Sequence, residues 1–287
     1  MLLSVCIVNW NTRDFLRACL RSLYRHPPLG WDMEILVVDN ASQDGSAALV
    51  RREFPEVALI ASPDNTGYAE GNNQAISQSK GDAILLLNPD VVVHANSLAH
   101  ALAFLTAHPD AAAVGARLLE PGGKTQRSLR GFPDPWPVLW EAIGFARLLP
   151  CVPALGAYRM TTFNYNQSGE ADQPMGSFLL IARRALSETG LMDTQFPIFF
   201  NDVDWCWRAK REHGWKIYYT PDALVTHWGG GSTRQAKPAM RDESHRALMR
   251  FYRKHYQSRL SPFLFRFVLV VMEWSRRRSF AQANAHD

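Results

Sequence analysis

The fold of this chain is decided by the stretch Ala83-Ile84-Leu85-Leu86-Leu87-Asn88-Pro89-Asp90. An apolar run of strand length ends abruptly in Asn-Pro-Asp, and such a run predicts a strand buried on both faces. Pro89 has no N–H to donate, so strand pairing is expected to stop there. Asp90 then lies at the carboxyl end of a core strand, where open α/β sheets bind their ligands. On these residues alone, a simple Asx-type turn is an equally good interpretation.

Strand and helix patterns alternate through residues 1–90. The predicted strands are 2–8, 34–38, 58–60 and 83–87, and the helices between them are 13–24, 46–53 and 70–80. This alternation predicts an α/β fold with a mostly parallel, twisted sheet flanked by helices. Polar residues follow the strands at Asn9, Asp39, Asn65 and Asp90. Because the carboxyl ends of parallel strands share one edge of a sheet, we expect these side chains to gather in one crevice.

The second half of the chain is less regular. We expect helices at 97–108, 183–188 and 242–256, and strands at 111–119, 178–181 and 216–219. Residues 130–153 hold five prolines and little periodicity, which indicates a long connection with one short helix near 138–148. Connections of that length are often functional lids, although a plain surface loop is the alternative.

A predicted helix that opens at Asn201 carries two carboxylates, Asp202 and Asp204. An acidic residue at a helix start is usually a cap, because unpaired N–H groups and the helix dipole favour an anion there. Two carboxylates beside aromatic residues suggest more than capping. His227 leaves a short apolar run at a glycine turn, where a lone histidine is more often structural than a ligand.

Composition excludes several kinds of protein. Four cysteines without paired spacing give neither a disulfide framework nor a zinc pattern, so we expect a reducing, cytoplasmic location. The first residues enter a strand pattern at once, and we expect no signal peptide. No G-x-G-x-x-G follows the first strand and no P-loop motif occurs, which disfavours a nicotinamide or P-loop nucleotide site.

Basic residues are concentrated near the C-terminus. The formal net charge of the chain is +4, and basic residues clearly outnumber acidic ones over 241–278. This pattern suggests an anionic surface as partner and gives no indication of nucleic acid. Residues 263–274 are very apolar but too short for a bilayer span, which needs about 20 residues. A helix in an anionic membrane interface and a helix packed on the domain are equal alternatives.

Seven motifs occur in one order over about residues 2–260. They are Val5-Cys6-Ile7-Val8-Asn9-Trp10-Asn11, Val37-Val38-Asp39-Asn40-Ala41-Ser42-Gln43-Asp44-Gly45-Ser46, Asn65-Thr66-Gly67-Tyr68-Ala69-Glu70-Gly71-Asn72-Asn73, Leu85-Leu86-Leu87-Asn88-Pro89-Asp90, Met175-Gly176-Ser177-Phe178, Asn201-Asp202-Val203-Asp204-Trp205-Cys206-Trp207-Arg208 and His227-Trp228-Gly229-Gly230-Gly231-Ser232. With these motifs the chain resembles the family-2 inverting glycosyltransferases of GT-A fold, and within them the bacterial rhamnosyltransferase-type branch.

The resemblance implies a nucleotide-diphospho-sugar donor bound along the carboxyl edge of the sheet. It implies that Asn9 touches the base and that Asp39 binds the base or ribose. By the same resemblance, the segment that lines the nucleotide holds Asn65, Gly67, Asn72 and Asn73.

The resemblance also implies a metal site and a catalytic base. Asn88-Pro89-Asp90 stands in place of the family's Asp-x-Asp signature, so Asp90 would bind Mg²⁺ or Mn²⁺, while Asn88 would contact the ribose or, more weakly, the ion. His227 matches a further metal ligand of some relatives. Asp202 would be the base, and Asn201 departs from the family's Glu at the acceptor side.

Chemistry supports these roles independently. A departing nucleotide diphosphate concentrates negative charge, which a divalent ion offsets as a Lewis acid. The acceptor hydroxyl needs a base within about 3 Å, on the face opposite the leaving group. Asp202 and Asp204 are two helical steps of about 100° apart, so only one of them can face the sugar. We prefer Asp202 and keep Asp204 as the alternative.

The predicted function is a metal-dependent, hexosyltransferase-type enzyme. It would move a sugar to a glycan or lipid-linked acceptor in cell-surface polysaccharide synthesis, and rhamnose from dTDP-rhamnose is the preferred donor. The enzyme would be cytoplasmic and could lie peripherally at the inner face of the cell membrane. The alternatives are a UDP- or GDP-sugar transferase of the same family and a non-catalytic nucleotide-sugar-binding protein. A nucleotidyltransferase is disfavoured because residues 9–13 contain neither glycine nor lysine.

Two regions are expected. Residues 1–240 would form the GT-A domain, with a nucleotide-binding half over about 1–120 and an acceptor half over about 121–240. Residues 241–287 would form a helical extension that is both basic and apolar.

Overall fold

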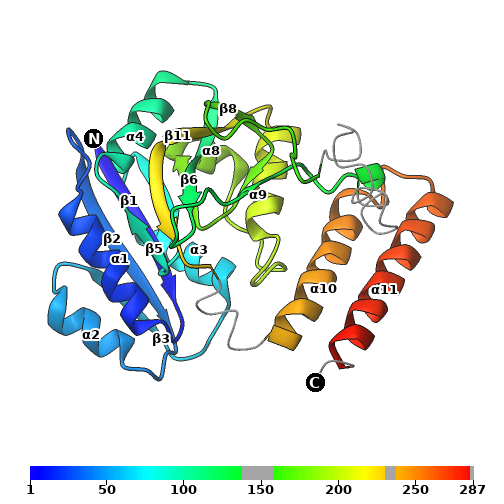
Figure 1. Cartoon of the computed structure of the whole chain (residues 1–287), viewed down its shortest axis with the longest axis horizontal. Helices are drawn as coiled ribbons and strands as arrows, with labels where there is room; N and C mark the ends of the chain where they lie inside the picture. Colours follow the sequence, from blue (N-terminus) through cyan, green and yellow to red (C-terminus); the bar gives the residue numbers. More distant parts are fainter. Residues whose placement is uncertain (138–157, 230–236, 285–287) are drawn as a thin grey trace.

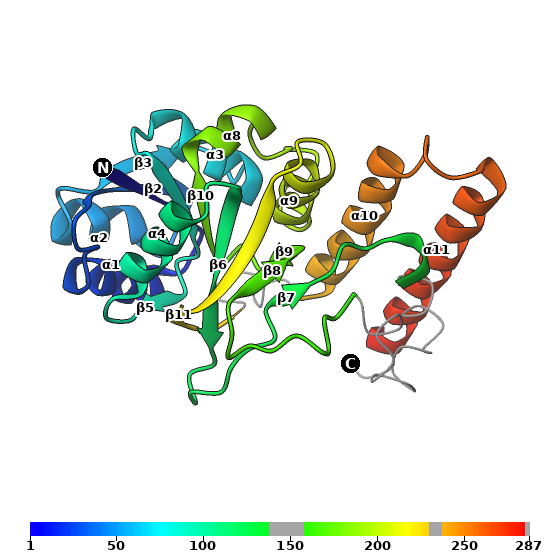
Figure 2. The ribbon, with the colours of Figure 1, turned by 90° about the horizontal axis from the view of Figure 1, so that it is seen from above.

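A central sheet with helices on both faces forms the body of the molecule (Figures 1 and 2). The structure is a computed structural model, and it describes residues 1–137, 158–229 and 237–284. The predicted helix near 138–148 lies outside the described residues. Within them, nine strands join in one sheet in the order β3-β2-β1-β4-β10-β6-β11-β5, with β8 paired to β11, and β7 and β9 form a separate two-stranded sheet.

The elements follow the predicted alternation through β6. The strands are β1 (Leu2–Asn9), β2 (Asp32–Asn40), β3 (Ala58–Ser62), β4 (Ala83–Leu87), β5 (Val91–Val93), β6 (Ala111–Leu119), β7 (Leu129–Arg130), β8 (Gly169–Ala171), β9 (Gln173–Pro174), β10 (Phe178–Ala182) and β11 (Lys216–His227). The helices are α1 (Arg13–Arg25), α2 (Ser46–Glu53), α3 (Tyr68–Gln78), α4 (Ser97–Ala107), α8 (Arg183–Thr189), α9 (Asn201–Arg211), α10 (Lys237–His255) and α11 (Pro262–Asn284).

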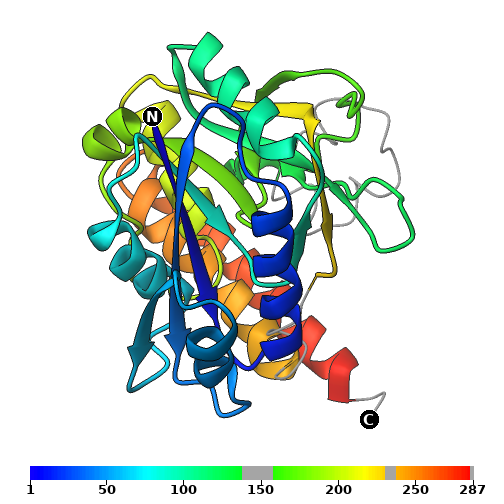
Figure 3. The same ribbon diagram turned by 90° about the vertical axis from the view of Figure 1, so that its left-hand side faces the viewer.

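The first half of the sheet is parallel, as the alternation predicts. Strands β3, β2, β1 and β4 pair in parallel, so their carboxyl ends lie along one edge. Figure 3 shows β1, β2 and β3 running in the same direction. Every residue of β4 is buried, which confirms the prediction made from its unbroken apolar run.

The second half is mixed. Strand β10 lies between β4 and β6 and is antiparallel to both. The predicted strand at 216–219 continues through the apolar run that ends at His227, so that both belong to one strand, β11, with a register shift between Thr220 and Leu224. The mostly parallel sheet is therefore confirmed, with β10 as an antiparallel strand at its centre.

Strand β5 was not predicted, because a strand of only three residues is too short to show a pattern of its own. Pairing stops at Pro89, but it resumes at Val91, where β5 pairs antiparallel with the end of β11. The register sets His227 opposite Val91, and the Trp228 N–H donates to the Asp90 carbonyl at 3.1 Å. This pairing brings the end of β11 beside Asp90.

The helices shield both faces of the sheet. Helices α1, α2 and α4 lie on one face, and α3, α8 and α9 lie on the other (Figure 2). In α1 the buried side chains Leu16, Leu20 and Leu23 recur at helical spacing and turn one apolar stripe to the sheet. Cys6 and Cys206 are buried free thiols, as expected, and burial raises the pKa of Cys6 to about 12.

Helices α10 and α11 stand side by side at one end of the molecule (Figures 1 and 2). Pro262 opens α11, a position where its missing N–H costs nothing. The buried Phe251 of α10 contacts Phe200 and Trp207, with ring centroids 5.8 and 6.4 Å away. No helix among the described residues is both long enough and apolar enough to cross a membrane.

The loop before α9 is attached to the start of α3. The carbonyl of Pro197 accepts hydrogen bonds from the N–H groups of Tyr68 at 2.6 Å and Ala69 at 3.1 Å. These are two of the donors that a helix start leaves unpaired. Gly67 precedes them with φ +89° and ψ 173°, a conformation essentially restricted to glycine. A Cβ at this position would lie 2.8 Å from the Pro197 oxygen.

Gly67→Ala should therefore lower the free energy of unfolding by about 1–3 kcal/mol, the usual cost of a strained backbone conformation. Urea denaturation at constant pH measures the change. Gly122→Ala is the matched control, because a Cβ there meets nothing within 4 Å. Equal stability of the two variants would contradict the role assigned to the Gly67 conformation.

Candidate functional site

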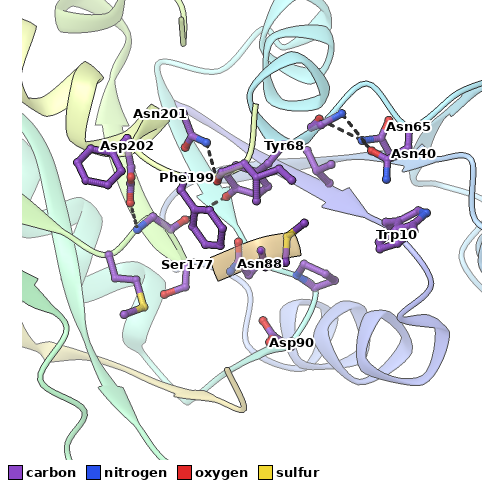
Figure 4. Close-up of a pocket in the computed structure, with 18 of the residues that line it drawn as sticks. Trp10, Asn40, Asn65, Tyr68, Asn88, Asp90, Ser177, Phe199, Asn201 and Asp202 are labelled. Atoms are coloured by element: carbon purple, nitrogen blue, oxygen red, sulfur yellow. Dashed lines mark hydrogen bonds between the residues drawn. The ribbon is translucent and has the colours of Figure 1, made fainter. Parts of the chain in front are cut away.

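A pocket opens at the carboxyl edge of the parallel strands (Figure 4). Its walls come from the ends of β1, β2 and β4, from the segments before α3, β10 and α9, and from β11 and α10. The lining residues are Val8, Trp10, Asn40, Asn65, Gly67, Tyr68, Asn88, Pro89, Asp90, Met175, Gly176, Ser177, Ile198, Phe199, Phe200, Asn201, Asp202, His227 and Met240. The predicted crevice at the strand ends is present, and it contains Asn65, Asn88 and Asp90.

One end of the pocket carries an indole and two amides. Trp10, Asn40 and Asn65 lie together there, away from Asp202 (Figure 4). Asn40 Nδ2 donates to Asn65 Oδ1 and to the Gly67 carbonyl, both at 3.0 Å, which ties the end of β2 to the loop before α3. Trp10 and Asn40 were absent from the predicted site, although both belong to quoted motifs. An indole offers the flat apolar face on which a nucleobase stacks.

Four predicted nucleotide-binding residues do not line this pocket: Asn9, Asp39, Asn72 and Asn73. Asn9 Nδ2 donates to Asp39 Oδ1 at 2.9 Å, and both side chains are buried. Asn72 Nδ2 donates to the Tyr68 carbonyl at 2.9 Å. Asn73 exchanges two hydrogen bonds with the Met192 backbone, at 2.9 and 3.0 Å. Their contact with a nucleotide stays a prediction. Their observed hydrogen bonds join β1 to β2, connect two residues within α3 and attach α3 to the Met192 backbone.

Asp90 and His227 come together as predicted. His227 Nε2 lies 3.4 Å from Asp90 Oδ1, and both side chains are buried, with 7% of His227 and 5% of Asp90 exposed. The other ring nitrogen, Nδ1, lies 3.0 Å from Oε1 of Gln126, a residue that the sequence did not single out. Both Asp90 and His227 line the pocket.

The pair fits a divalent cation. A carboxylate oxygen and an imidazole nitrogen suit Mn²⁺, and a carboxylate suits Mg²⁺. No cluster of three or more His, Cys, Asp or Glu side chains with metal-site geometry occurs among the described residues. Two protein ligands would leave most positions around an ion to phosphate oxygens and water.

Asp202 lies at the opposite end of the pocket from Trp10 (Figure 4). Its Oδ2 accepts hydrogen bonds from the Gly176 N–H at 2.9 Å and from Gln173 Nε2 at 3.2 Å, and its Oδ1 accepts from the Val203 N–H at 2.8 Å. Burial raises the pKa of Asp202 above its ordinary value, although these hydrogen bonds act in the opposite direction. A carboxylate with a raised pKa is a stronger base.

Asp204 has a different environment on the same helix. Its Oδ1 accepts from Lys254 Nζ and His255 Nε2, both at 2.7 Å, and its Oδ2 accepts from Arg208 Nε at 2.9 Å. Burial acts to raise its pKa, but the His255 hydrogen bond and the charges of Arg208 and Lys254 outweigh this and leave the pKa below its ordinary value. Asp204 is fully buried and does not line the pocket. The geometry therefore favours Asp202 as the base, and Asp204 fastens α9 to α10.

Asn201, where the family pattern has Glu, supports the loop before α9. Its Nδ2 donates to the carbonyls of Phe196 at 3.2 Å and Ile198 at 2.9 Å. A glutamate could not make these bonds, because an ionised carboxylate has no donor. The next residue back, Phe200, has a positive φ of 69°, a strained value for a side chain of its size. The amide of Asn201 thus holds a strained loop beside Asp202.

The sequence of this chain matches the family model described as "Glycosyl transferase family 2" over residues 4–168, more than half of its length. The chain belongs to glycosyltransferase family 2. The GT-A fold and the family resemblance of the motifs are thereby confirmed, and the fold accords with solved structures. The mannosyltransferase PcManGT from Pyrobaculum calidifontis, in complex with GDP-Man and Mn²⁺, superposes with a TM-score of 0.61 at 19% identity, over 99% of this chain and 73% of that one.

Two curated relatives of the chain are sugar transferases. This family-2 chain is 28% identical over 216 residues to N-acetylglucosaminyl-diphospho-decaprenol L-rhamnosyltransferase of Mycobacterium tuberculosis, covering 70% of this chain and 68% of the relative. It is 24% identical over 217 residues to the low-salt glycan biosynthesis hexosyltransferase Agl10 of Haloferax volcanii, covering 74% of this chain and 62% of the relative. Family membership therefore makes the chain a glycosyltransferase, and both of these relatives carry names of sugar transferases.

Replacing Asp204 should destabilise this glycosyltransferase. In Asp204→Asn the cations that converge on the buried carboxylate lose their counter-charge, and we expect a loss on the order of 3 kcal/mol in the free energy of unfolding. Because the folded-state pKa is lowered, the contribution is complete above the unfolded value of about 3.9 and declines as pH falls through the folded value. Urea denaturation at several pH values measures both effects.

Asp14→Asn is the control for this experiment. The Asp14 side chain is 71% exposed and pairs with Arg13 and Arg17 on the surface, where an ion pair contributes about 0–1 kcal/mol. If Asp204→Asn were no more harmful than Asp14→Asn, the anchoring role of Asp204 would be wrong. The same conclusion would follow if the loss did not decline in acid.

Proposed function

We propose that this chain is a metal-dependent inverting transferase that moves a sugar from a nucleotide diphosphate to a hydroxyl group of a glycan or lipid-linked acceptor. One observation carries the proposal. A carboxylate with a raised pKa, Asp202, lines the same pocket as the Asp90–His227 pair. Figure 4 shows Asp202 and Asp90 apart from each other in this pocket. Inversion needs a base and a leaving-group site on opposite sides of the sugar, and this arrangement can supply both.

In the proposed reaction, Asp202 accepts the proton of the acceptor hydroxyl while that oxygen bonds to the anomeric carbon. The bond from the anomeric carbon to the diphosphate oxygen breaks, and the electron pair leaves with the nucleotide. Gly176 and Gln173 hold the Asp202 carboxylate in place. Asp90 and His227 would hold a divalent ion, which when bound offsets the charge of the diphosphate.

Rhamnose from dTDP-rhamnose is the donor that we propose. The activity of the mycobacterial relative supports it, because that protein is an L-rhamnosyltransferase. The wall of the pocket near Asp202 supports it too, since Met175, Ile198 and Phe199 are apolar and suit the methyl group of a 6-deoxy sugar. A UDP- or GDP-sugar donor and a non-catalytic binding protein are the competing outcomes.

A panel of dTDP-, UDP- and GDP-sugars with Mn²⁺ tests the function, with thermal shift reporting binding and nucleotide release reporting transfer.

Asp202→Asn should still bind the donor but lose kcat by a factor on the order of 10²–10⁴ or more, because the base is gone. In the native protein, kcat/KM should decline in acid as Asp202 protonates, at a pH above the ordinary carboxyl value of about 3.9.

Folding controls keep this result interpretable. A raised folded-state pKa means that ionised Asp202 opposes folding, so Asp202→Asn should keep or raise the Tm. Full turnover by Asp202→Asn would reject the base assignment. Donor binding without transfer by the native protein, across a range of sugar acceptors, would favour the binding-protein alternative.

We also propose that α11 binds peripherally to the anionic inner face of the cell membrane. Four large apolar residues recur along one side of this helix at spacings of four, three and four, and remain exposed. The exposed fractions are 84% for Phe263, 50% for Phe267, 67% for Val270 and 48% for Trp274. Val268 and Met272 on another side are buried, so α11 is apolar on both its packed and its exposed sides. A helix of that kind needs an apolar environment outside the protein.

The charge of the C-terminal residues indicates which apolar environment the exposed side of α11 would enter. Residues 241–278 hold ten basic and three acidic side chains, a net +7, whereas the remaining residues hold 21 basic and 24 acidic, a net −3. Arg266 and Arg277 are exposed on α11 beside the apolar residues. Each basic residue near an anionic surface contributes about 1 kcal/mol to binding. An anionic lipid surface therefore fits both the apolar residues and the charge.

Vesicle sedimentation tests this contact. The native protein should bind phosphatidylglycerol vesicles more strongly than phosphatidylcholine vesicles, and Phe263→Ser/Phe267→Ser should lose most of that binding. Leu29→Ser is the control, since Leu29 is 76% exposed but distant in sequence from α11. Undiminished binding by the double variant would reject the contact. A change from dimer to monomer in the same variant would instead assign this face to a second copy.

A further inference from the structure

Gln126 makes contacts that only a fixed amide orientation allows. Its Nε2 lies 2.6 Å from the His227 carbonyl and 3.5 Å from the Leu119 carbonyl, and its Oε1 lies 3.0 Å from His227 Nδ1. Both carbonyls require a donor, so the NH₂ group must face them. The Gln126 oxygen is therefore turned to the imidazole ring, where it can only accept.

The backbone holds this side chain in place. The Gln126 N–H donates to the Leu118 carbonyl at 2.8 Å, just beyond the turn that follows β6. Strand β6 pairs in parallel with β11, with Leu119 opposite Thr226. Gln126 thus lies beside His227 because both are fixed to β6, one by a turn and the other by a strand.

Two acceptors compete for the ring hydrogen of His227. Gln126 Oε1 faces Nδ1 at 3.0 Å, and Asp90 Oδ1 faces Nε2 at 3.4 Å. A hydrogen on Nδ1 leaves the lone pair of Nε2 directed at Asp90, whereas a hydrogen on Nε2 blocks that lone pair. A metal ligand needs the lone pair, and the partner of the other nitrogen selects the tautomer.

We propose that Gln126 is a positioning residue that keeps the hydrogen of His227 on Nδ1 and so leaves Nε2 ready to bind a divalent cation with Asp90. The inference rests on the metal site of the proposed function. Without the Gln126 oxygen, Asp90 is the remaining acceptor and draws the hydrogen to Nε2. Cation binding then has to displace it.

The test compares Gln126→Leu with Thr226→Val. Thr226 is next to His227, and its hydroxyl lies 2.8 Å from His94 Nε2, so Thr226→Val also removes one side-chain contact from β11. Titration of Mn²⁺, with and without dTDP, followed by electron paramagnetic resonance of the free ion gives the affinity. We expect Gln126→Leu to bind Mn²⁺ about 10–100-fold more weakly, as is usual when the partner of a metal-binding histidine is removed. Thr226→Val should keep the native affinity.

A spectroscopic measurement on the metal-free protein separates positioning from simple destabilisation. Long-range ¹⁵N–¹H correlation of the ring, assigned with His227→Gln, should show the hydrogen on Nδ1 in the native protein and in Thr226→Val, and on Nε2 in Gln126→Leu. Native Mn²⁺ affinity or an unchanged tautomer in Gln126→Leu would overturn the proposal. Failure of the native protein to bind Mn²⁺ would overturn it together with the metal site, while sugar transfer in EDTA would show that the transferase function stands without both.

Discussion

The antiparallel pairing of β5 with the end of β11 is the constraint on which the site depends. It lasts only from Val225 opposite Val93 to His227 opposite Val91. Yet it joins the parallel half of the sheet, which ends in Asp90, to the strand that carries His227. Each side chain alone would be a polar group at the end of a strand. Together, buried at 3.4 Å, they form a site that neither strand could make separately.

The sequence pattern of a segment correctly predicted those features that depend on that segment alone. The apolar run ending in Asn88-Pro89-Asp90 correctly indicated a buried parallel strand with Asp90 at its carboxyl end, because period and burial are properties of the segment itself. The contact of Asp90 with His227 could be expected only through family resemblance, since a three-residue strand such as β5 has no pattern of its own. Gln126 was missed for the same reason: its position follows from a turn and a strand register that sequence reasoning did not reach.

The residues at the first strand ends show a different limit. Asn9 and Asp39 follow strands β1 and β2 as the alternation required, but their side chains bond to each other instead of lining the pocket. Pattern places a residue at an edge of the sheet, and packing then decides where its side chain points. In contrast, Trp10 and Asn40, the next residues along, line the pocket.

Asp202 and Asp204 show how one helix can give two carboxylates opposite properties. Helical geometry predicted that they would face different directions, but which one faced the pocket depended on α10, whose Lys254 and His255 are far along the chain. Burial dominates for Asp202 and raises its pKa, whereas cations surround Asp204 and lower it. Environments that separate two such pKa values are a usual way to assign one carboxylate to chemistry and the other to structure.

The uneven distribution of charge along the chain has a consequence for encounter as well as for binding. With a net +7 over 241–278 and −3 over the rest, the molecule is a permanent electric dipole whose positive pole is the end formed by α10 and α11. Near a surface of negative potential such a molecule experiences a torque before any contact forms. At the anionic membrane that we propose as its partner, the molecule would arrive already turned, with the C-terminal helices leading. Its search for an acceptor held in that membrane would then be reduced from three dimensions to two.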